Sequence, residues 1–326
     1  MSGATIPEIP AIFSHVPKDS MVLYIKNPQD LFDLLSIKSN TTTRISGIDV
    51  SDTVKKTLQN FFELKDFTTL EQNLKHELAL VIDNLDMTTP DITMILSEAD
   101  RAALSPTAKA RVVGSKDGFI YIASSKTNID RMMNLEKKNS LADAPDFHYV
   151  WWKKSSLIRD AFFFVGDAFF EKMLSFETYI AHYRKIHDVE KLSMFQELSW
   201  AYEDVYGKNP ENLEELIKNF QDSRIIKDDL AGYTIVDGNI SDPRIGSIKS
   251  LKTLSEVNYD LSKITRAEIE DYKINILKYR DTWRASLDPM GIILNRYGDG
   301  MEVDFFMTPI PNLSSSELSQ AQSLFE

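Results

Sequence analysis

The chain has 326 residues, of which 43% are hydrophobic and 26% charged, as in globular proteins and unlike disordered ones. It carries 49 acidic and 37 basic residues, and the resulting net charge of −12 opposes binding to nucleic acid and to anionic lipid. The absence of cysteine excludes disulfides, thiolate zinc sites, iron–sulfur ligation and cysteine nucleophiles. No apolar stretch reaches the roughly 18–20 residues of a membrane helix, so we expect one or two folded domains without a membrane span.

The beginning of the chain predicts a strand followed by helices. Met21–Lys26 is rich in strand formers, and Asn27-Pro28 supplies the N-cap and the first position of a helix. Apolar residues recur at helical spacing within Asp52–Glu63, and Thr69–Lys75 is also expected to be helical.

Two hairpins are predicted next. Glu77–Leu85 and Asp91–Ser97 are apolar runs joined by a short loop. Arg111–Gly114 and Phe119–Ser124 flank Asp117-Gly118, and Asp-Gly is a strong signal for a two-residue hairpin turn. A further helix is expected after the second hairpin.

The second half of the chain opens with the same order of elements as the first. Asp160–Asp167 is a strand-like run that leads into a helical segment, Ala168–Leu174, just as Asp19–Lys26 leads into the helix from Pro28. This repetition indicates an internal duplication.

Long helices and a last hairpin complete the predicted elements. Glu177–Tyr206 carries apolar residues on one face and predicts a long helix that Gly207 ends. Thr265–Glu268 has the spacing of a capping box and predicts the start of another helix, which Pro289 ends. Gly291–Met307 contains two strand-like runs around an Asp-Gly turn.

These elements predict an α+β protein with mainly antiparallel sheets and helices packed on one side, built as a duplicated unit. We divide the chain into an α+β unit at residues 1–150 and a second α+β unit with long helices at residues 151–326.

Three short motifs together form a recognisable pattern. They are a Pro-x-Asp start before a strand in Val16–Ile25, a strand ending in small residues in Asp117–Ser125, and a Ser-Leu-Ala-Asp segment in Ser140–Phe147. This pattern resembles a bacterial family of envelope-associated proteins of undefined function. Later parts of the likeness are Asp160–Asp167, Tyr206–Leu216 and Tyr279–Pro289. The resemblance implies a periplasmic or cell-surface protein, with a cytoplasmic location left open, and it carries over no catalytic residue.

A second, shorter likeness concerns the segment from Tyr206 to Pro210, which is similar to a stretch of type II secretion pseudopilins. The apolar N-terminal helix of those proteins has no counterpart in this sequence, so a filament role is not expected.

Trp151 and Trp152 form the predicted interaction surface. Adjacent side chains in an extended segment point to opposite faces, so one of the two rings is expected to be exposed. Other aromatic pairs, such as Phe61-Phe62 and Phe169-Phe170, are expected to pack in the core.

Carboxylates gather near the end of the chain, at Asp281, Asp288, Asp299 and Asp304, with Trp283 close in sequence. Two acids across a sugar, beside an aromatic ring, are what glycoside hydrolysis needs. The alternative is that these acids serve turns and caps.

Two other groups of residues, one acidic and one of histidines, are considered as candidate functional sites. The acids within 211–215 follow Pro210 and match the first turn of a helix, where they complement its dipole. His182 and His187 are five positions apart and would not share one face of a helix, so no metal site is expected.

The sequence contains no G-x-S-x-G, Walker or G-x-G-x-x-G motif, so no cofactor is predicted. We therefore expect a non-enzymatic interaction or structural module of the bacterial cell envelope, with a protein partner in an envelope assembly. The alternatives are a carboxylate-dependent hydrolase acting near Asp281–Asp304 and a module that binds a small ligand.

Overall fold

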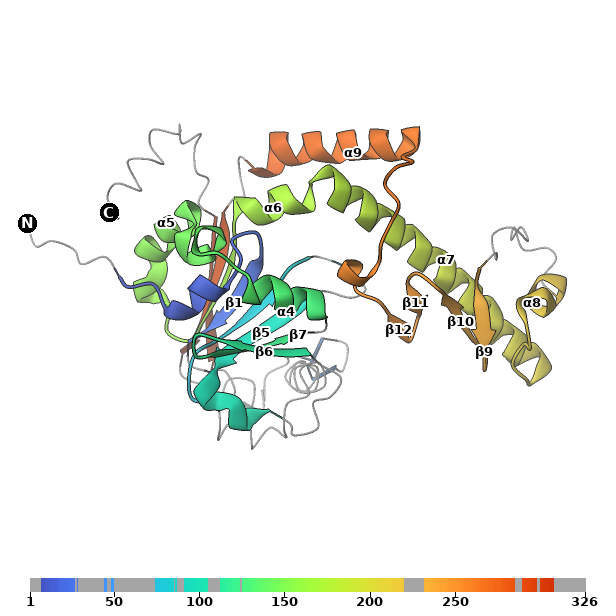
Figure 1. Cartoon of the computed structure of the whole chain (residues 1–326), viewed down its shortest axis with the longest axis horizontal. Coiled ribbons are helices and arrows are strands. Elements are labelled where there is room, and N and C mark those ends of the chain that lie inside the picture. The colour runs from blue at the N-terminus through green and yellow to red at the C-terminus, as the bar shows by residue number, and fades with distance from the viewer. Residues whose placement is uncertain are drawn as a thin grey trace, which may run out of the picture. The chain divides into compact units, whose positions relative to one another are not determined.

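A computed structural model describes residues 7–26, 28, 44–45, 48–49, 74–84, 86, 91–104, 112–123, 125–219, 232–284, 289–297 and 300–307. The chain divides into two compact units (Figure 1). Unit 1 contains residues 1–84, 91–173 and 275–326, and unit 2 contains residues 85–90 and 174–274. Both units combine helices with antiparallel strands, which confirms the α+β class.

The predicted division at residue 150 is wrong. A single eight-stranded sheet takes strands from both sides of that position, because the strands at 161–165, 290–297 and 300–307 join those from the first half of the chain. Unit 2 interrupts unit 1 twice, with the short segment 85–90 and the long segment 174–274.

The sheet of unit 1 has the strand order β14-β13-β8-β1-β4-β5-β7-β6, with every neighbouring pair antiparallel. The strands are β1 (Met21–Ile25), β4 (Leu78–Ile82), β5 (Ile92–Ser97), β6 (Val112–Lys116), β7 (Phe119–Ala123), β8 (Ala161–Val165), β13 (Met290–Tyr297) and β14 (Gly300–Met307). A separate two-stranded ladder joins β2 (Arg44–Ile45) to β3 (Ile48–Asp49).

All three predicted hairpins are confirmed, at β4–β5, β6–β7 and β13–β14. At the β6–β7 turn, Asp117 and Gly118 have φ values of 51° and 82°. Positive φ at both central residues is what a two-residue turn needs to follow the twist of the strands, and glycine adopts it without steric strain.

The centre of this sheet has a symmetric strand order. β1 and β8 pair with each other, for example at Leu23 and Phe163, and each continues outward into an antiparallel neighbour and then a hairpin partner. The trio β1, β4, β5 therefore has the same order as the trio β8, β13, β14. A duplication would produce this arrangement, and the duplication itself stays a prediction.

Helices cover one face of the sheet in unit 1 (Figure 1). They are η1 (Ala11–His15), α4 (Lys126–Met133) and α5 (Pro145–Lys154), and they bury side chains such as Phe13, Met132 and Phe147 against Tyr24 and Phe162. Unit 1 also contains the short elements η2 (Glu98–Ala103), η3 (Lys137–Asn139), η4 (Leu141–Asp143), η5 (Ser155–Leu157) and α6 (Asp167–Met173). The opposite sheet face has its own apolar cluster, which includes Leu78, Met94 and Ile120.

Unit 2 is built on α7 (Phe176–Tyr206), the predicted long helix, which ends at Gly207 with a φ of 67°. A small antiparallel sheet lies against it, formed by β9 (Thr234–Val236), β10 (Asn239–Asp242), β11 (Gly246–Ser247) and β12 (Ser250–Leu251). Gln196 Nε2 and Ser199 Oγ both donate to the carbonyl of Gly238 at 2.8 Å, which fixes the β9–β10 turn on the helix. The apolar contacts come from Leu192, Phe195, Tyr202, Leu216, Ile240 and Ile245.

Further helices of unit 2 are α8 (Leu213–Asn219), η7 (Leu254–Glu256) and most of α9 (Arg266–Lys278). The last residues of α9, from Asn275, belong to unit 1, where the helix continues as a π-helical turn, η8 (Tyr279–Trp283). The capping box at the start of α9 is confirmed, because Thr265 Oγ1 accepts from the Glu268 amide while Glu268 Oε2 accepts from the Thr265 amide. Lys185 on α7 forms a buried ion pair with Asp86.

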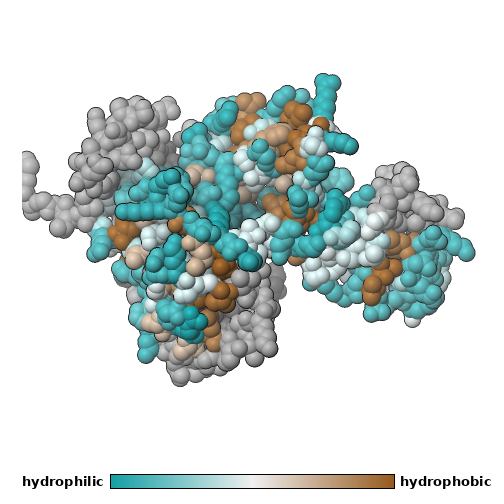
Figure 2. Space-filling view, viewed as in Figure 1, coloured by the Kyte–Doolittle hydropathy of each residue, from teal (hydrophilic) through white to brown (hydrophobic). Residues whose placement is uncertain are grey.

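The helices expected after Pro28 and within 52–63 and 69–75 lie outside the described residues, except for a few positions. No described helix is long and apolar enough to cross a membrane. In the space-filling view of Figure 2, hydrophilic residues dominate, and apolar residues gather in separate patches, including one over α9.

Candidate functional site

The outer edge strand of the unit 1 sheet exposes apolar side chains. In the described part of the chain, β14 pairs with β13 and with no other strand. Val303, Phe305 and Met307 alternate along one face of β14, and 53, 56 and 40% of their respective surfaces are exposed. Edge strands usually carry charges, proline or bulges that prevent pairing with another chain. An exposed apolar face on an edge strand therefore marks a candidate interaction site.

The neighbouring strand extends this apolar surface. Met290, Ile292 and Leu294 of β13 lie directly opposite Met307, Phe305 and Val303, respectively, and all three are partly exposed. We call these six residues the β13–β14 apolar face.

The other face of β14 anchors the strand to the sheet. The Phe306 ring is buried and stacks on Phe162, with 6.2 Å between ring centroids and an interplanar angle of 7°. The ring occupies the space above Gly291, where an added Cβ would lie 2.8 Å from Phe306 Cε2. Gly291 therefore gives the ring room to lie flat against β13.

Acidic side chains share this other face with Phe306. Glu302 accepts a hydrogen bond of 2.8 Å from Arg159 Nη2, and Asp304 is exposed and pairs with no described side chain. The edge strand thus presents apolar residues on one face and carboxylates on the other.

The predicted interaction surface, Trp151 and Trp152, lies on the helix α5 and not in an extended segment. Trp151 is 6% exposed and packs in the core against Phe13 and Phe147, while its indole N–H donates to the Glu8 carbonyl at 3.1 Å. Trp152 is 41% exposed, with the Lys153 ammonium 4.1 Å from its ring centre. Only Trp152 is therefore available at the surface.

The acids considered for hydrolysis do not form a described pair. Asp281 is exposed in η8 and Asp304 is exposed on β14, and no described contact joins them. Asp288 and Asp299 lie outside the described residues. The described geometry gives no support to two acids facing each other across a cleft, the arrangement that a glycoside hydrolase would need.

The acids near α8 stabilise local structure. Glu215 accepts hydrogen bonds from the Tyr202 hydroxyl and, at 2.8 Å, from the Glu211 amide. The bond from Tyr202 lowers the pKa of Glu215 and keeps it ionised. Glu214 lies in the first turn of α8, as the sequence predicted for these acids.

The histidines are dispersed. His182 is partly buried, and burial lowers its pKa, while His187 is exposed. Within the described residues, no group of three or more histidine or acidic side chains has the geometry to hold a metal ion.

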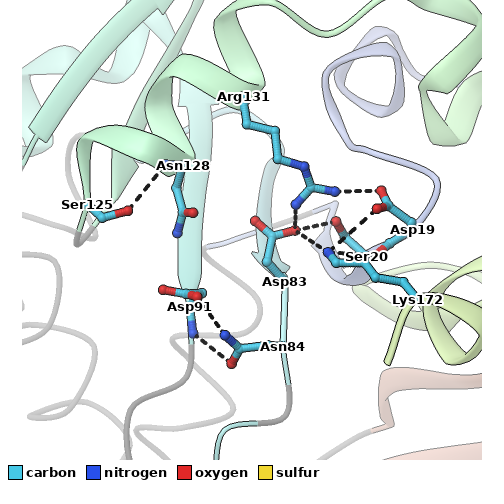
Figure 3. A network of polar contacts seen from close by, with 9 residues as sticks. All are labelled: Asp19, Ser20, Asp83, Asn84, Asp91, Ser125, Asn128, Arg131 and Lys172. Carbon is cyan, nitrogen blue, oxygen red and sulfur yellow. Dashed lines mark hydrogen bonds and ion pairs between the residues drawn. The ribbon is translucent and has the colours of Figure 1, made fainter. Parts of the chain in front are cut away.

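A partly buried network of charged side chains, with Asp83 at its buried centre, was missed by the sequence reasoning (Figure 3). Arg131 on α4 donates to Asp83 after β4 and, at 2.5 Å, to Asp19 before β1. Asp83 also accepts from Ser20 Oγ at 2.5 Å, and the Lys172 ammonium on α6 lies 3.8 Å from Asp83 and 3.6 Å from Asp19. The network joins two strand ends to two helices.

Burial and charge act in opposite directions on the two cations of this network. Burial disfavours the Arg131 charge, but Asp83 and Asp19 more than offset this and raise its pKa. For Lys172 burial dominates, assisted by the nearby Arg131 charge, and its pKa is lowered although Asp83 opposes the shift. Two cations facing two carboxylates leave the network neutral, which makes its burial tolerable.

A neighbouring polar cluster lies beside the network (Figure 3). Asn84 Nδ2 donates to Asp91 Oδ2 at 2.5 Å, which links the end of β4 to the start of β5. Three buried polar atoms close to these strand ends, Asp83 Oδ2, Thr93 Oγ1 and Asn128 Nδ2, have no hydrogen-bond partner among the described groups. The signal in the sequence was the polar pair that borders each strand, Asp19-Ser20 before β1 and Asp83-Asn84 after β4.

Comparison of the chain with protein-family models, with curated proteins and with solved structures found no match. The likeness to envelope-associated proteins therefore depends on the short segments described above and stays a prediction.

Proposed function

We propose that this chain is a non-enzymatic interaction module that binds an extended segment of a partner protein along β14. The observation that carries the proposal is the exposed β13–β14 apolar face on an edge strand. Strand addition at such an edge combines backbone hydrogen bonds, which give affinity, with side-chain contacts at alternate positions, which give specificity.

The alternating side chains of β14 indicate which partner sequence would fit as an added strand. Apolar side chains of an added strand would pack beside Val303, Phe305 and Met307, and the side chains between them would lie on the face of Glu302 and Asp304. Opposite charges across neighbouring strands stabilise a sheet. The fitting segment therefore alternates apolar and basic residues.

A second copy of this chain fits the same edge less well. In a symmetric antiparallel pair of β14 strands centred on Val303, Glu302 of each copy lies opposite Asp304 of the other, and a pair centred on Asp304 places that acid opposite itself. Like charges directly opposite each other destabilise a sheet, and the net charge of −12 adds repulsion between copies.

The resemblance of Val16–Ile25 and Ser140–Phe147 to envelope-associated proteins supports a partner in an assembly of the bacterial cell envelope. On this proposal the protein faces the periplasm or the cell surface.

The test uses two labelled ten-residue peptides, one alternating valine and lysine and the other alternating valine and glutamate. Fluorescence anisotropy should show binding of the lysine peptide and much weaker binding of the glutamate peptide. Phe305→Thr should weaken the binding of the lysine peptide about tenfold, equivalent to about 1.4 kcal/mol of lost apolar contact. Val236→Thr, which changes an exposed valine on β9 of unit 2, is the matched control and should leave binding unchanged.

Equal binding of both peptides, or equal binding by Phe305→Thr and the unmodified protein, would contradict the proposal. Sedimentation gives a separate answer, because a dimer that forms with rising concentration and is lost in Phe305→Thr would identify a second copy as the occupant.

A further inference from the structure

A polar pocket in unit 2 is independent of the proposed interaction edge. It has a volume of about 480 Å³, within the range of roughly 300–1,000 Å³ that small-molecule sites occupy. Tyr183, His187 and Asp188 of α7 form one wall, Arg244 in the β10–β11 turn forms another, and Tyr259 and Asp260 line it from the segment after η7.

The charges around this pocket are unbalanced. Two guanidiniums, Arg184 and Arg244, face four carboxylates, those of Asp188, Asp242, Asp260 and Glu268. The excess of negative charge favours a cationic ligand, because a charged hollow raises the local concentration of ions of opposite sign.

Three of the four carboxylates are already engaged, because Asp188 pairs with Arg244 at 3.2 Å and also accepts from the Tyr259 hydroxyl. Both oxygens of Glu268 accept from Arg184, at 2.6 and 3.2 Å, and Thr265 adds further hydrogen bonds. Both oxygens of Asp242 accept from Arg244, one from its backbone amide and one from its side chain. These acids hold the pocket walls together, so a ligand would bind to other groups.

Asp260 is the most exposed of the four carboxylates and forms no described ion pair with a basic side chain. Its Oδ1 accepts from the Ser262 amide at 2.9 Å, and the Ser262 hydroxyl also donates to this carboxylate. These two hydrogen bonds, the one from the hydroxyl first, lower the pKa of Asp260, so the group carries its charge at neutral pH. Asp188 of α7 lines the same pocket, and its Oδ2 accepts from the Tyr259 hydroxyl at 3.0 Å.

Aromatic rings complete the site. The Tyr183 ring is exposed, and the Tyr259 ring is held in place by its hydrogen bond to Asp188. The faces of tyrosine rings attract cations and also cover methylene groups.

We propose that this pocket binds an organic cation, a ligand with a protonated amino or guanidinium group, with Asp260 as the main acceptor. The ammonium or guanidinium donates to the exposed Asp260 carboxylate, and the carbon chain of the ligand lies against the rings of Tyr183 and Tyr259. The ligand is either a free amine or a lysine or arginine side chain of a peptide.

The test is calorimetric titration of the intact chain with spermidine, with agmatine and with a short lysine-containing peptide. Binding of the free amines identifies a metabolite site, and binding of the peptide alone identifies a side-chain site. Asp260→Asn keeps an acceptor for the Ser262 amide but removes the charge, and it should weaken binding about threefold to tenfold. Asp237→Asn, an equal change of charge in the exposed β9–β10 turn, should leave binding unchanged.

Three outcomes would overturn the assignment. The first is no binding of any of these cations at about 10 mM. The second is equal weakening by Asp260→Asn and Asp237→Asn, which would show general attraction to an acidic protein. The third is stronger binding of citrate than of the cations, which would make Arg244 the ligand-binding group. None of these outcomes bears on β14, which lies in the other unit.

Discussion

Arg131 donates to Asp83 and, at 2.5 Å, to Asp19, so one guanidinium joins the end of β4 to the start of β1. Asp83 is almost fully buried, and the Arg131 pKa is raised by both carboxylates despite its own burial. The planar, forked guanidinium suits this double role, which the single ammonium of lysine cannot reproduce.

Arg131→Met should lower the free energy of unfolding by about 3–5 kcal/mol, because it leaves the buried Asp83 charge without its main partner. Arg131→Lys should have a smaller effect, since a lysine can still approach one of the two acids. Urea unfolding measures both. Lys138→Met removes a cation from an exposed pair with Glu136 and should change stability by less than about 1 kcal/mol. If Arg131→Met also lowers the free energy of unfolding by less than about 1 kcal/mol, the guanidinium does not hold the network together.

Gly291→Ala should destabilise the attachment of β14, because the new methyl group would overlap the Phe306 ring. We expect a loss of about 1–3 kcal/mol, as for other overpacked sites. Hydrogen exchange should show faster exchange of the β14 amides than in the unmodified protein.

The same substitution in a Phe306→Leu background is the control for Gly291→Ala, since the smaller side chain vacates the space above position 291. If Gly291→Ala is equally destabilising in both backgrounds, the ring is not the cause.

The pH dependence of stability should report the buried His15. Its Nδ1 lies 2.6 Å from the Tyr121 hydroxyl, and burial lowers its pKa from the usual 6.5, with Asp117 opposing and Lys116 assisting. Below about pH 6.5 the unfolded chain therefore takes up a proton that the folded chain does not. Above this pH His15 does not affect the free energy of unfolding. As the pH decreases from about 6.5 toward the folded-state pKa, the free energy of unfolding falls.

His15→Gln should reduce this slope, by at most about 1.4 kcal/mol per pH unit for a single group. Tyr121→Phe keeps the histidine and should keep most of the slope. Unfolding curves between pH 7 and pH 5 measure both variants, and an unchanged slope in His15→Gln would exclude His15 as the titrating group. His182, whose pKa is also lowered by burial, should account for part of what remains.

Short motifs in the sequence were sufficient to predict most of the described helices, strands and turns. The Asp117-Gly118 turn, the capping box at Thr265 and the end of α7 at Gly207 each depend on a few adjacent residues, and all three are confirmed. Trp151 and Trp152 were misplaced because a helix that starts at Pro145 carries them, and the strand-like composition of the segment gave no sign of it.

Long-range pairing was beyond the sequence patterns. Nothing near residue 161 indicates that β8 pairs with β1 on one side and β13 on the other, so the domain division failed. The acidic and basic residues in Figure 3 could not be predicted to lie together for the same reason. They belong to strands and helices that are far apart in the chain. The exposure of β14 likewise follows from its place at the end of the sheet, which no local pattern encodes.

The pairing of β8 with both β1 and β13 has a consequence during synthesis on the ribosome. Residues 174–274 of unit 2 are translated between β8 and β13, so the phenylalanine-rich β8 leaves the exit tunnel well before β13, the strand that pairs with its second edge. At about 5–20 residues per second this delay is on the order of 10 s. During that time one backbone edge of β8 is unpaired and its apolar side chains are exposed in the nascent chain. We therefore expect a holding chaperone to bind β8 during synthesis.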